Sequence, residues 1–273
     1  MISLGNPTRG TRLARLFGRA HSLHRPSASD RFGFDRAAAS SAPGTTRKVV
    51  RASTARPAGY FVCKRIVDAI LAALALLGLL PLLLAIALLI KLDSPGPILF
   101  RQERVGSRRR RSRAGAPVWE ITHFKVCKFR SMFYGASESL HQLHTRAFVQ
   151  DSEAADAIKL TQDPRVTRLG ALLRRTSLDE LPQLINVLKG EMSLVGPRPV
   201  PVYEAAAYSE WHWERLAALP GISGWWQVKG RGRVTFTEMM RMDIEYVRRQ
   251  SLWLDFKILC ATIPAVLSRR GAE

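Results

Sequence analysis

The segment AILAALALLGLLPLLLAIALLI, residues 69–90, contains 22 residues and no charge. A run of more than about 18 apolar residues is typical of a membrane-inserted helix. Pro81 leaves 12 apolar residues before it and nine after it. At about 1.5 Å per residue, each half is shorter than the ~30 Å hydrocarbon core. Because proline removes a helical hydrogen bond and clashes with the preceding turn, the sequence predicts a membrane-inserted helix, a break at Pro81 and a second helix.

Basic residues lie at both ends of this segment. Lys64 and Arg65 precede it, while Lys91 and an arginine-rich stretch at 101–113 follow it. Because positive charge favours the cytoplasmic side, both ends are expected there, which favours a re-entrant hairpin over residues 60–93. The alternative is a straight spanning helix that is kinked at the proline, since proline is tolerated in such helices.

The net charge of the chain is +20, and most of it flanks the apolar segment. Residues 1–59 contribute +9 and residues 101–113 contribute +6. Residues 1–59 are rich in Ser, Ala, Pro and Arg without a sustained apolar period, which predicts a disordered basic tail. An Arg- and Ser-rich N-terminus is also typical of an organelle transit peptide. We interpret the charge mainly as a means of contact with anionic membrane lipids.

The stretch after the apolar segment contains recognisable local patterns. SPGPILFRQERVG (94–106) predicts a turn and a short extended stretch. HFKVCKFRSM (123–132) alternates loosely and predicts a strand that runs into a loop. The three cysteines are isolated in the sequence, which predicts neither a zinc site nor a disulfide framework.

Several motifs follow one another in an order that is specific to one family. They are DSPGPILFRQERVG (93–106), KFRSM (128–132), TSLDELPQLINVLKGEMSLVGPRP (176–199), PGISGWWQVKGR (220–231) and LDFKIL (254–259). Over about residues 60–273 the chain resembles the bacterial sugar transferase family, the monotopic polyprenyl-phosphate sugar-1-phosphate transferases. It looks most like the short exopolysaccharide-initiating enzymes, because no multi-span region precedes the apolar segment.

The resemblance implies a fold and a location. The fold class is expected to be α+β and mostly helical, in a monotopic protein of the bacterial inner (cytoplasmic) membrane. Residues 94–273 would form the sugar-phosphate transferase domain on the cytoplasmic face. The chain departs from the family where Lys229 replaces a common Ser or Asn, and where Leu80-Pro81 replaces the usual Ser-Pro.

The resemblance also implies a reaction. A sugar 1-phosphate would pass from a UDP-sugar to polyprenyl (undecaprenyl) phosphate, forming polyprenyl-diphosphate-sugar and releasing UMP, as the first membrane step of exopolysaccharide or other surface glycan synthesis. Asp179 would attack phosphorus to give a covalent aspartyl phosphosugar, and Glu180 would orient it, relay a proton or help hold Mg²⁺, with Asp179 as the other metal ligand. Ser177-x-x-Glu180 also matches a helix capping box, which is the structural alternative.

Other residues are candidates for phosphate or substrate binding. Arg198 lies in Gly-Pro-Arg-Pro, a stiff turn that suits rigid placement of a guanidinium, and Pro199 completes that turn. Lys128 and Arg130 in KFRSM are weaker candidates for the nucleotide side. Gln227, in the GWWQ stretch, is a further candidate in a segment whose tryptophans either stack on a base or pack in the fold.

Asp255 lies between Leu254 and Phe256, so its carboxylate needs a partner. It is either an ion-paired core residue or part of the site, and the family places an important acid at this match. Asp243 is expected to be structural, and a local ion-paired turn is expected at 163–165.

The expected partners are a UDP-sugar, polyprenyl phosphate and anionic lipids, and no nucleic acid; a homo-oligomer is compatible with the sequence. The alternative function is a non-enzymatic, membrane-tethered basic adaptor or a nucleic-acid-binding protein. That alternative accounts for the charge but leaves SLDELPQ and GPRP unexplained. Discrimination between sugars depends on the shape of the pocket, so the sequence does not identify the sugar.

Overall fold

The computed structural model describes residues 48–51, 56–137, 163–230 and 234–267, together with Gln142, Thr145 and Val149. All of them belong to one unit that extends from Thr46 to Glu273. Residues 1–47, which form most of the predicted basic tail, lie outside the described residues. The last part of the predicted tail is structured, because Val49–Val50 forms strand β1 and Ala58 begins the first helix.

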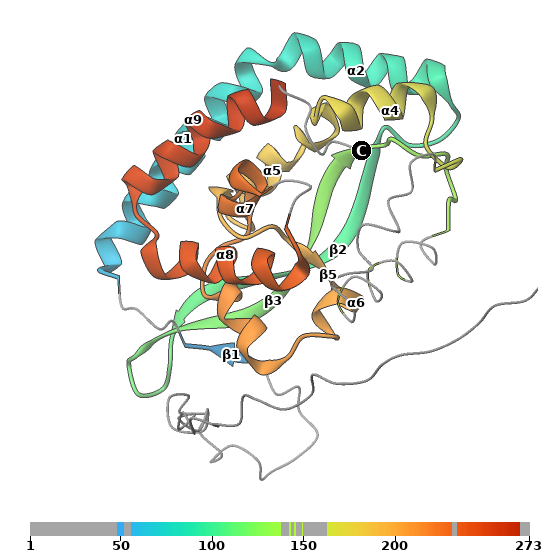
Figure 1. The fold of residues 1–273 in the computed structure, drawn as a ribbon. Helices are drawn as coiled ribbons and strands as arrows, with labels where there is room; N and C mark the ends of the chain where they lie inside the picture. The colour runs from blue at the N-terminus through green and yellow to red at the C-terminus, as the bar shows by residue number, and fades with distance from the viewer. Residues whose placement is uncertain are drawn as a thin grey trace, which may run out of the picture. The chain divides into compact units, whose positions relative to one another are not determined.

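The apolar segment forms two helices, α1 (Ala58–Gly78) and α2 (Leu80–Asp93), which are bent by 63° relative to each other. The predicted helix-break-helix is therefore present, but the break lies at Leu79, two residues before Pro81. Pro81 occupies the first turn of α2, where its missing N–H has no helical partner to lose. In Figure 1 the two helices form a continuous arm with α9 (Leu252–Leu267) beside α1.

Within the described part of the chain, no unbroken helix combines the length and apolar character that crossing a bilayer requires. The bent pair α1 and α2 meets both criteria only when its two helices are taken together. At about 1.5 Å per residue, the 14 residues of α2 extend about 21 Å, which is less than the ~30 Å hydrocarbon core.

The main sheet is built on a long antiparallel hairpin of β2 (Leu99–Arg111) and β3 (Pro117–Phe129). Strand β1 pairs with β3, and β5 (Val200–Pro201) pairs with β2, so the strand order is β1-β3-β2-β5. Both long strands exceed the short extended stretches that the sequence predicted. The run Arg108 to Arg111 belongs to β2, and in this run Arg110 Nε lies 2.9 Å from Glu120 Oε2.

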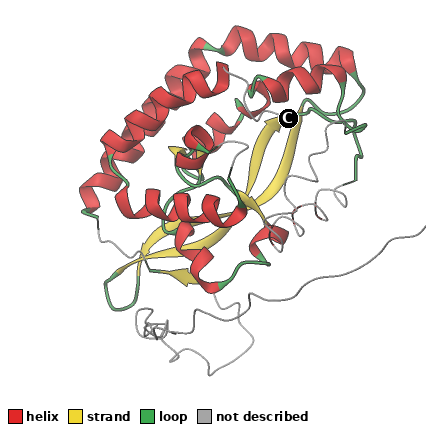
Figure 2. Ribbon diagram, in the orientation of Figure 1, coloured by secondary structure: helices red, strands yellow, loops and turns green. Residues whose placement is uncertain are grey.

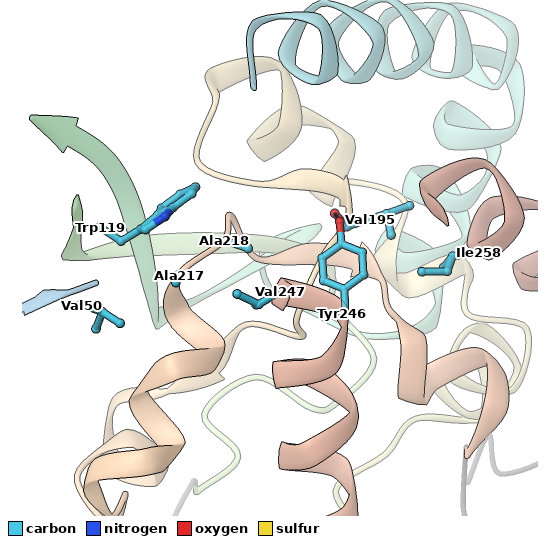
Figure 3. Packing of buried hydrophobic residues seen from close by; sticks show 8 residues of the cluster. All are labelled: Val50, Trp119, Val195, Ala217, Ala218, Tyr246, Val247 and Ile258. Atoms are coloured by element: carbon cyan, nitrogen blue, oxygen red, sulfur yellow. Dashed lines mark hydrogen bonds between the residues drawn. The ribbon is translucent and has the colours of Figure 1, made fainter. Parts of the chain in front are cut away.

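A second, two-stranded parallel sheet joins β4 (Ser193–Val195) to β6 (Gly221–Ser223). A hydrophobic cluster connects this sheet to β1, β3, α9 and α8 (Phe236–Arg249). Figure 3 shows Tyr246 of α8 beside Val195 of β4, with Ile258 of α9 to the right of Tyr246 and Trp119 of β3 on the opposite side of the cluster. The side chains of Tyr246 and Ile258 are only 1% exposed, so α8 and α9 are fixed against the strands.

Short helices fill the remaining connections, and helix exceeds strand in the described chain (Figure 2), which confirms the predicted α+β class. They are α4 (Arg168–Arg175), the 3₁₀ helix η3 (Leu178–Glu180), α5 (Gln183–Lys189), α6 (Val202–Ala205), the 3₁₀ helix η4 (Glu210–Leu216) and α7 (Trp225–Lys229).

A buried polar network joins α1 to the rest of the domain. Lys64 Nζ lies 2.8 Å from Asp255 Oδ2 on α9 and 3.7 Å from Asp68 Oδ2 on α1. Asp68 accepts a 2.7 Å hydrogen bond from Ser193 Oγ, and Asp255 accepts one of the same length from the Tyr246 hydroxyl. Lys64, Asp68 and Asp255 are 7%, 5% and 6% exposed, so these charges are stabilised by one another and not by water.

Two arginines hold the ends of other helices. Arg65 donates to the carbonyls of Val187 at 2.5 Å and Leu188 at 2.6 Å, and so caps the C-terminus of α5. Arg130 does the same for α2, where it donates to the carbonyls of Ile90 at 3.2 Å and Ser94 at 2.6 Å. Lys64 and Arg65, which the sequence analysis treated as topology signals, therefore have partners inside the protein.

The Lys64–Asp255 pair yields a stability prediction. Lys64→Met and Asp255→Leu should each destabilise the protein by about 3–5 kcal/mol, because each leaves a buried charge without its partner. The double variant should recover part of the loss, since Asp68 still lacks Lys64, and Lys257→Met on the exposed face of α9 is the control. Thermal unfolding of the detergent-solubilised chain measures the effect, and losses that simply add would contradict the pairing.

Candidate active site

Asp179 and Glu180 lie in η3, between α4 and α5. Ser177, which precedes this turn, has a φ of 57° and is the one described non-glycine residue with positive φ. Such strain is often retained where function requires a particular backbone geometry. Ser177 makes no side-chain cap hydrogen bond, so the capping-box interpretation of Ser177-x-x-Glu180 does not apply.

Glu180 is the centre of the ion-pair cluster. Its Oε1 accepts from Lys128 Nζ at 2.7 Å and from Arg198 Nη2 at 3.0 Å. Burial by itself would raise the pKa of Glu180, but the charges and hydrogen bonds of Arg198 and Lys128 hold that pKa well below its usual range. Glu180 is therefore ionised at neutral pH, and it joins β3, η3 and the Gly-Pro-Arg-Pro turn.

Asp179 has the opposite environment. Its side chain is mostly buried, and no hydrogen-bond or ion-pair partner occurs for it among the described residues. Burial raises the pKa of Asp179, the charge of Lys128 lowers it, and the neighbouring Glu180 raises it. A carboxylate with no hydrogen bond to weaken it, close to cations, is suited to nucleophilic attack on a phosphate.

Backbone contacts fix the Gly-Pro-Arg-Pro turn, residues 196–199, against the second sheet. The Gly196 N–H donates to the Ser223 carbonyl at 2.9 Å, and the Gly221 N–H donates to the Pro197 carbonyl at 2.8 Å. A Cβ on Gly196 would lie 2.2 Å from the Leu219 carbonyl oxygen, so only glycine fits here. The turn that carries Arg198 is therefore held by its neighbours as well as by its prolines.

A buried ion pair supports the same turn from below. Arg215, which is 0% exposed, donates from Nη2 to the Arg198 carbonyl at 2.9 Å and to Asp243 Oδ2 at 2.5 Å. Asp243 is thus structural, as the sequence predicted. The predicted ion-paired turn at 163–165 is also confirmed, because Arg165 Nη2 lies 2.6 Å from Asp163 Oδ2.

The other predicted site residues have different surroundings. Pro199 offers its carbonyl to Arg104 Nη1 at 3.2 Å. Gln227 lies next to the turn: a Cβ on Gly224 would be 2.6 Å from the Gly196 carbonyl and 2.9 Å from Gln227 Oε1. That Oε1 is buried and has no partner among the described groups, so it is a free acceptor beside the site.

Arg130 and Asp255 do not join the cluster around Glu180. The three backbone carbonyls that accept from the guanidinium of Arg130 belong to Ile90, Ser94 and Pro95. The sequence allowed Asp255 to be either an ion-paired core residue or part of the site, and its pairing with Lys64 fits the first alternative. These contacts give both residues a structural role, and their predicted part in substrate binding stays a prediction.

Two arginines that the sequence did not single out lie near the cluster around Glu180. Arg174, at the end of α4, donates from Nε to Ser131 Oγ at 2.9 Å, and the charge of Asp179 acts on it. Arg104, in β2, lies beside the turn through its bond to Pro199. Arg104 belongs to the RQERVG motif, which indicates the family. The motif alone does not predict that Arg104 lies beside the Gly-Pro-Arg-Pro turn.

The donor set limits how a metal can bind. Among the described residues no group of three or more His, Cys, Asp and Glu side chains is arranged to hold an ion. Mg²⁺ is commonly held by one or two carboxylates together with substrate phosphates and water. Asp179 and Glu180 Oε2, which have no hydrogen-bond partners in the described structure, fit an ion bound in that shared way.

The cluster is rich in cations. Lys128, Arg198, Arg174 and Arg104 surround two carboxylates, so the partly buried site has an excess of positive charge. Guanidinium groups bind phosphate through forked, charge-assisted hydrogen bonds. Such an arrangement of cations around a carboxylate is suited to binding phosphate.

Known proteins show the same sequence pattern. The model of the bacterial sugar transferase family matches residues 59–269. A UDP-glucose:undecaprenyl-phosphate glucose-1-phosphate transferase of Xanthomonas campestris pv. campestris is 41% identical over 226 residues, which cover 78% of this chain and 40% of that protein. The transferase of the same name from Escherichia coli K12 is 43% identical over 208 residues, or 73% of this chain and 39% of that one.

A third relative matches over nearly its whole length. The exopolysaccharide production protein ExoY of Rhizobium meliloti is 38% identical over 217 residues, which cover 80% of this chain and 90% of that protein. The chain thus spans about two fifths of the length of the Xanthomonas and Escherichia relatives and most of the length of ExoY.

Proposed function

The chain belongs to the bacterial sugar transferase family, and we propose that it transfers a sugar 1-phosphate from a UDP-sugar to polyprenyl phosphate. The observation that supports this proposal most is Asp179, which has no partner among the described residues and lies beside a carboxylate that Lys128 and Arg198 share. The relatives named for glucose-1-phosphate transfer to undecaprenyl phosphate support the same reaction. By analogy with ExoY, the product would enter exopolysaccharide synthesis.

The proposed chemistry has two displacements at phosphorus. A carboxylate oxygen of Asp179 attacks the phosphorus that bears the sugar, the bond from that phosphorus to the bridging oxygen breaks, and UMP leaves with that oxygen. A phosphate oxygen of polyprenyl phosphate then attacks the same phosphorus. The bond to Asp179 breaks, the carboxylate is restored, and polyprenyl-diphosphate-sugar is formed.

The neighbouring residues have separate roles in this scheme. Arg198 and Lys128 neutralise charge on the phosphate oxygens, and Glu180 holds both cations in place. Because Glu180 stays ionised at low pH, it keeps this function while Asp179 titrates. Mg²⁺, held by Asp179 or Glu180 together with substrate oxygens, would supply further neutralisation of the diphosphate when bound.

The lipid substrate requires access from a membrane, and α1 is built for that contact. Its exposed residues Val62, Ile66, Ile70 and Leu74 follow a helical spacing of four and are 52–60% exposed. The buried stripe on α1 is formed by Lys64, Asp68 and Ala72. A helix that buries charges and exposes apolar side chains is inverted relative to a helix in water, which supports insertion into lipid.

We propose a re-entrant insertion of α1 and α2 from the cytoplasmic face. Helix α2 exposes Leu84, Leu88 and Leu92 at 61–74%, and α9 beside α1 exposes Trp253 and Ile263 at 63% and 64%. The bend of 63° directs the two helices away from a common axis, as a hairpin in one leaflet requires. The basic residues of β2 would then contact anionic headgroups.

Asp179→Asn tests the nucleophile. The variant should lose UMP release by roughly 10³-fold or more, and with it any labelled phosphosugar adduct on the protein, because an amide does not attack phosphorus. Purified chain, radiolabelled UDP-sugars and polyprenyl phosphate give the measurement. Glu245→Gln, at an exposed pair with Arg249, is the matched control, and an adduct on Asp179→Asn would reject the assignment.

Lys128→Gln tests the electrostatics of Asp179. The charge of Lys128 lowers the pKa of Asp179, so its removal should raise that pKa. Because Asp179 must be ionised to attack, the acid limb of kcat/KM for the UDP-sugar should move to higher pH. Lys189→Gln, at the exposed end of α5, should leave the acid limb of the pH profile unchanged. An unchanged acid limb in Lys128→Gln would show that the charge of Lys128 does not lower the pKa of Asp179.

The topology is open to a direct test. Epitope tags at the two termini should both be accessible to protease from the cytoplasmic side, in inside-out vesicles, and both protected in intact spheroplasts. The result follows because a hairpin returns the chain to the leaflet that it entered. Tags accessible from opposite sides would instead show that α1 and α2 together span the membrane.

A further inference from the structure

Arg104 lies within the antiparallel sheet, at a point where its strand β2 is flanked by β3 and β5. Its Nη1 donates to the Pro199 carbonyl at 3.2 Å and its Nη2 to Gln102 Oε1 at 2.5 Å. Its Nε is buried and has no partner among the described groups. The guanidinium therefore retains donor capacity at the turn that carries Arg198.

The charge of Arg104 is not balanced locally. No carboxylate of the described residues lies within ion-pair distance of it, and the charges of Glu180 and Glu204 act on it only from further away. Burial, and next the positive charge of Arg198, lower the pKa of Arg104 to about 10. Arg104 is thus still a cation at neutral pH, beside a second cation and largely out of water, which is unfavourable in the empty site.

We propose that Arg104 binds a phosphate oxygen of the substrate together with Arg198. The ligand is a phosphate ester, either the diphosphate of a nucleotide sugar or the phosphate of the polyprenyl lipid. This inference rests on the proposed function for its substrates. An anion between the two arginines would remove their repulsion and use the free Nε, as forked guanidinium recognition requires.

A purely structural role for Arg104 makes a different prediction. If Arg104 only held the Pro199 carbonyl, a neutral donor of similar length would replace it, and charge would not matter. Arg104→Gln retains a donor without the charge, whereas Arg104→Lys retains the charge without the fork. If Arg104→Gln loses anion binding while its thermal stability is unchanged, Arg104 binds the anion and does not merely hold the Pro199 carbonyl.

The binding experiment uses the full chain in detergent with inorganic pyrophosphate and UDP as probes, measured by isothermal titration calorimetry in Mg²⁺-containing buffer. Arg104→Gln should raise the dissociation constant of both probes by roughly 10-fold to 100-fold, because one charge-assisted interaction is lost. Arg104→Lys should show a smaller rise. Arg101→Gln, an exposed arginine on the same strand, is the matched control and should bind like the wild type.

Kinetic measurements distinguish the two phosphate sources. A higher KM for the UDP-sugar, with slower UMP release in the absence of polyprenyl phosphate, assigns Arg104 to the nucleotide sugar. A higher KM for polyprenyl phosphate alone assigns it to the lipid phosphate, and either result supports phosphate recognition. Unchanged probe binding and unchanged KM values in a folded Arg104→Gln variant would overturn the inference.

Failure of the proposed function has another signature. If the wild type released no UMP from any UDP-sugar while pyrophosphate binding still depended on Arg104, the reaction would be wrong and the anion site would stand. If the wild type turned over its substrates but Arg104→Gln bound pyrophosphate normally, the reaction would stand and the anion site would be wrong.

Discussion

One oxygen of Glu180 holds together three segments that are distant in the sequence. Lys128 comes from the end of β3, Glu180 from the turn after α4, and Arg198 from the turn after β4. A buried carboxylate is stable only with such partners, so the chain must bring both cations to it before the site exists. Asn186 reinforces the arrangement, since its side chain bonds the backbone of Lys125 and Cys127 and fixes α5 to β3. Asp179 is then placed by its neighbours, without a hydrogen bond from its side chain to any other described residue.

A second constraint governs the other side of the protein. Because α1 exposes its apolar stripe, the face that packs on the domain must carry its specificity in polar contacts. Lys64, Asp68 and Asp255 supply them, and the Lys64–Asp255 ion pair is largely shielded from water. The same pairing explains why α9 lies beside α1. An apolar interface between these helices would not discriminate between packing on the domain and dissolving in lipid.

The sequence predicted the local features well and the long-range partners poorly. Asp179, Glu180, Arg198 and the helix break follow from motifs and proline chemistry, which act over a few residues. Arg130 shows the limit: a charged side chain in a family motif suggests a substrate, yet its partners are carbonyls at the end of α2, about 40 residues away. Which carbonyls are left unbonded depends on where a helix ends, and the break itself moved from Pro81 to Leu79 because the first turn of a helix accommodates proline.

The distribution of positive charge shows the same difference between local sequence features and long-range contacts. Of the net +20, the parts at 1–59 and 101–113 dominate the arithmetic. The arginines at the end of β2 are mostly exposed, where salt screens them and each contributes little to any one contact. Lys128, Arg198 and Arg104 are few, but they are partly buried, and the charges of Arg198 and Glu180 act on both of the other two cations. Electrostatic interactions are strongest where water is excluded, so under the proposed function these three cations would contribute more to phosphate affinity than the long basic runs. In the proposed function, the exposed arginines would contact lipid headgroups, and the partly buried ones would bind the substrate phosphate.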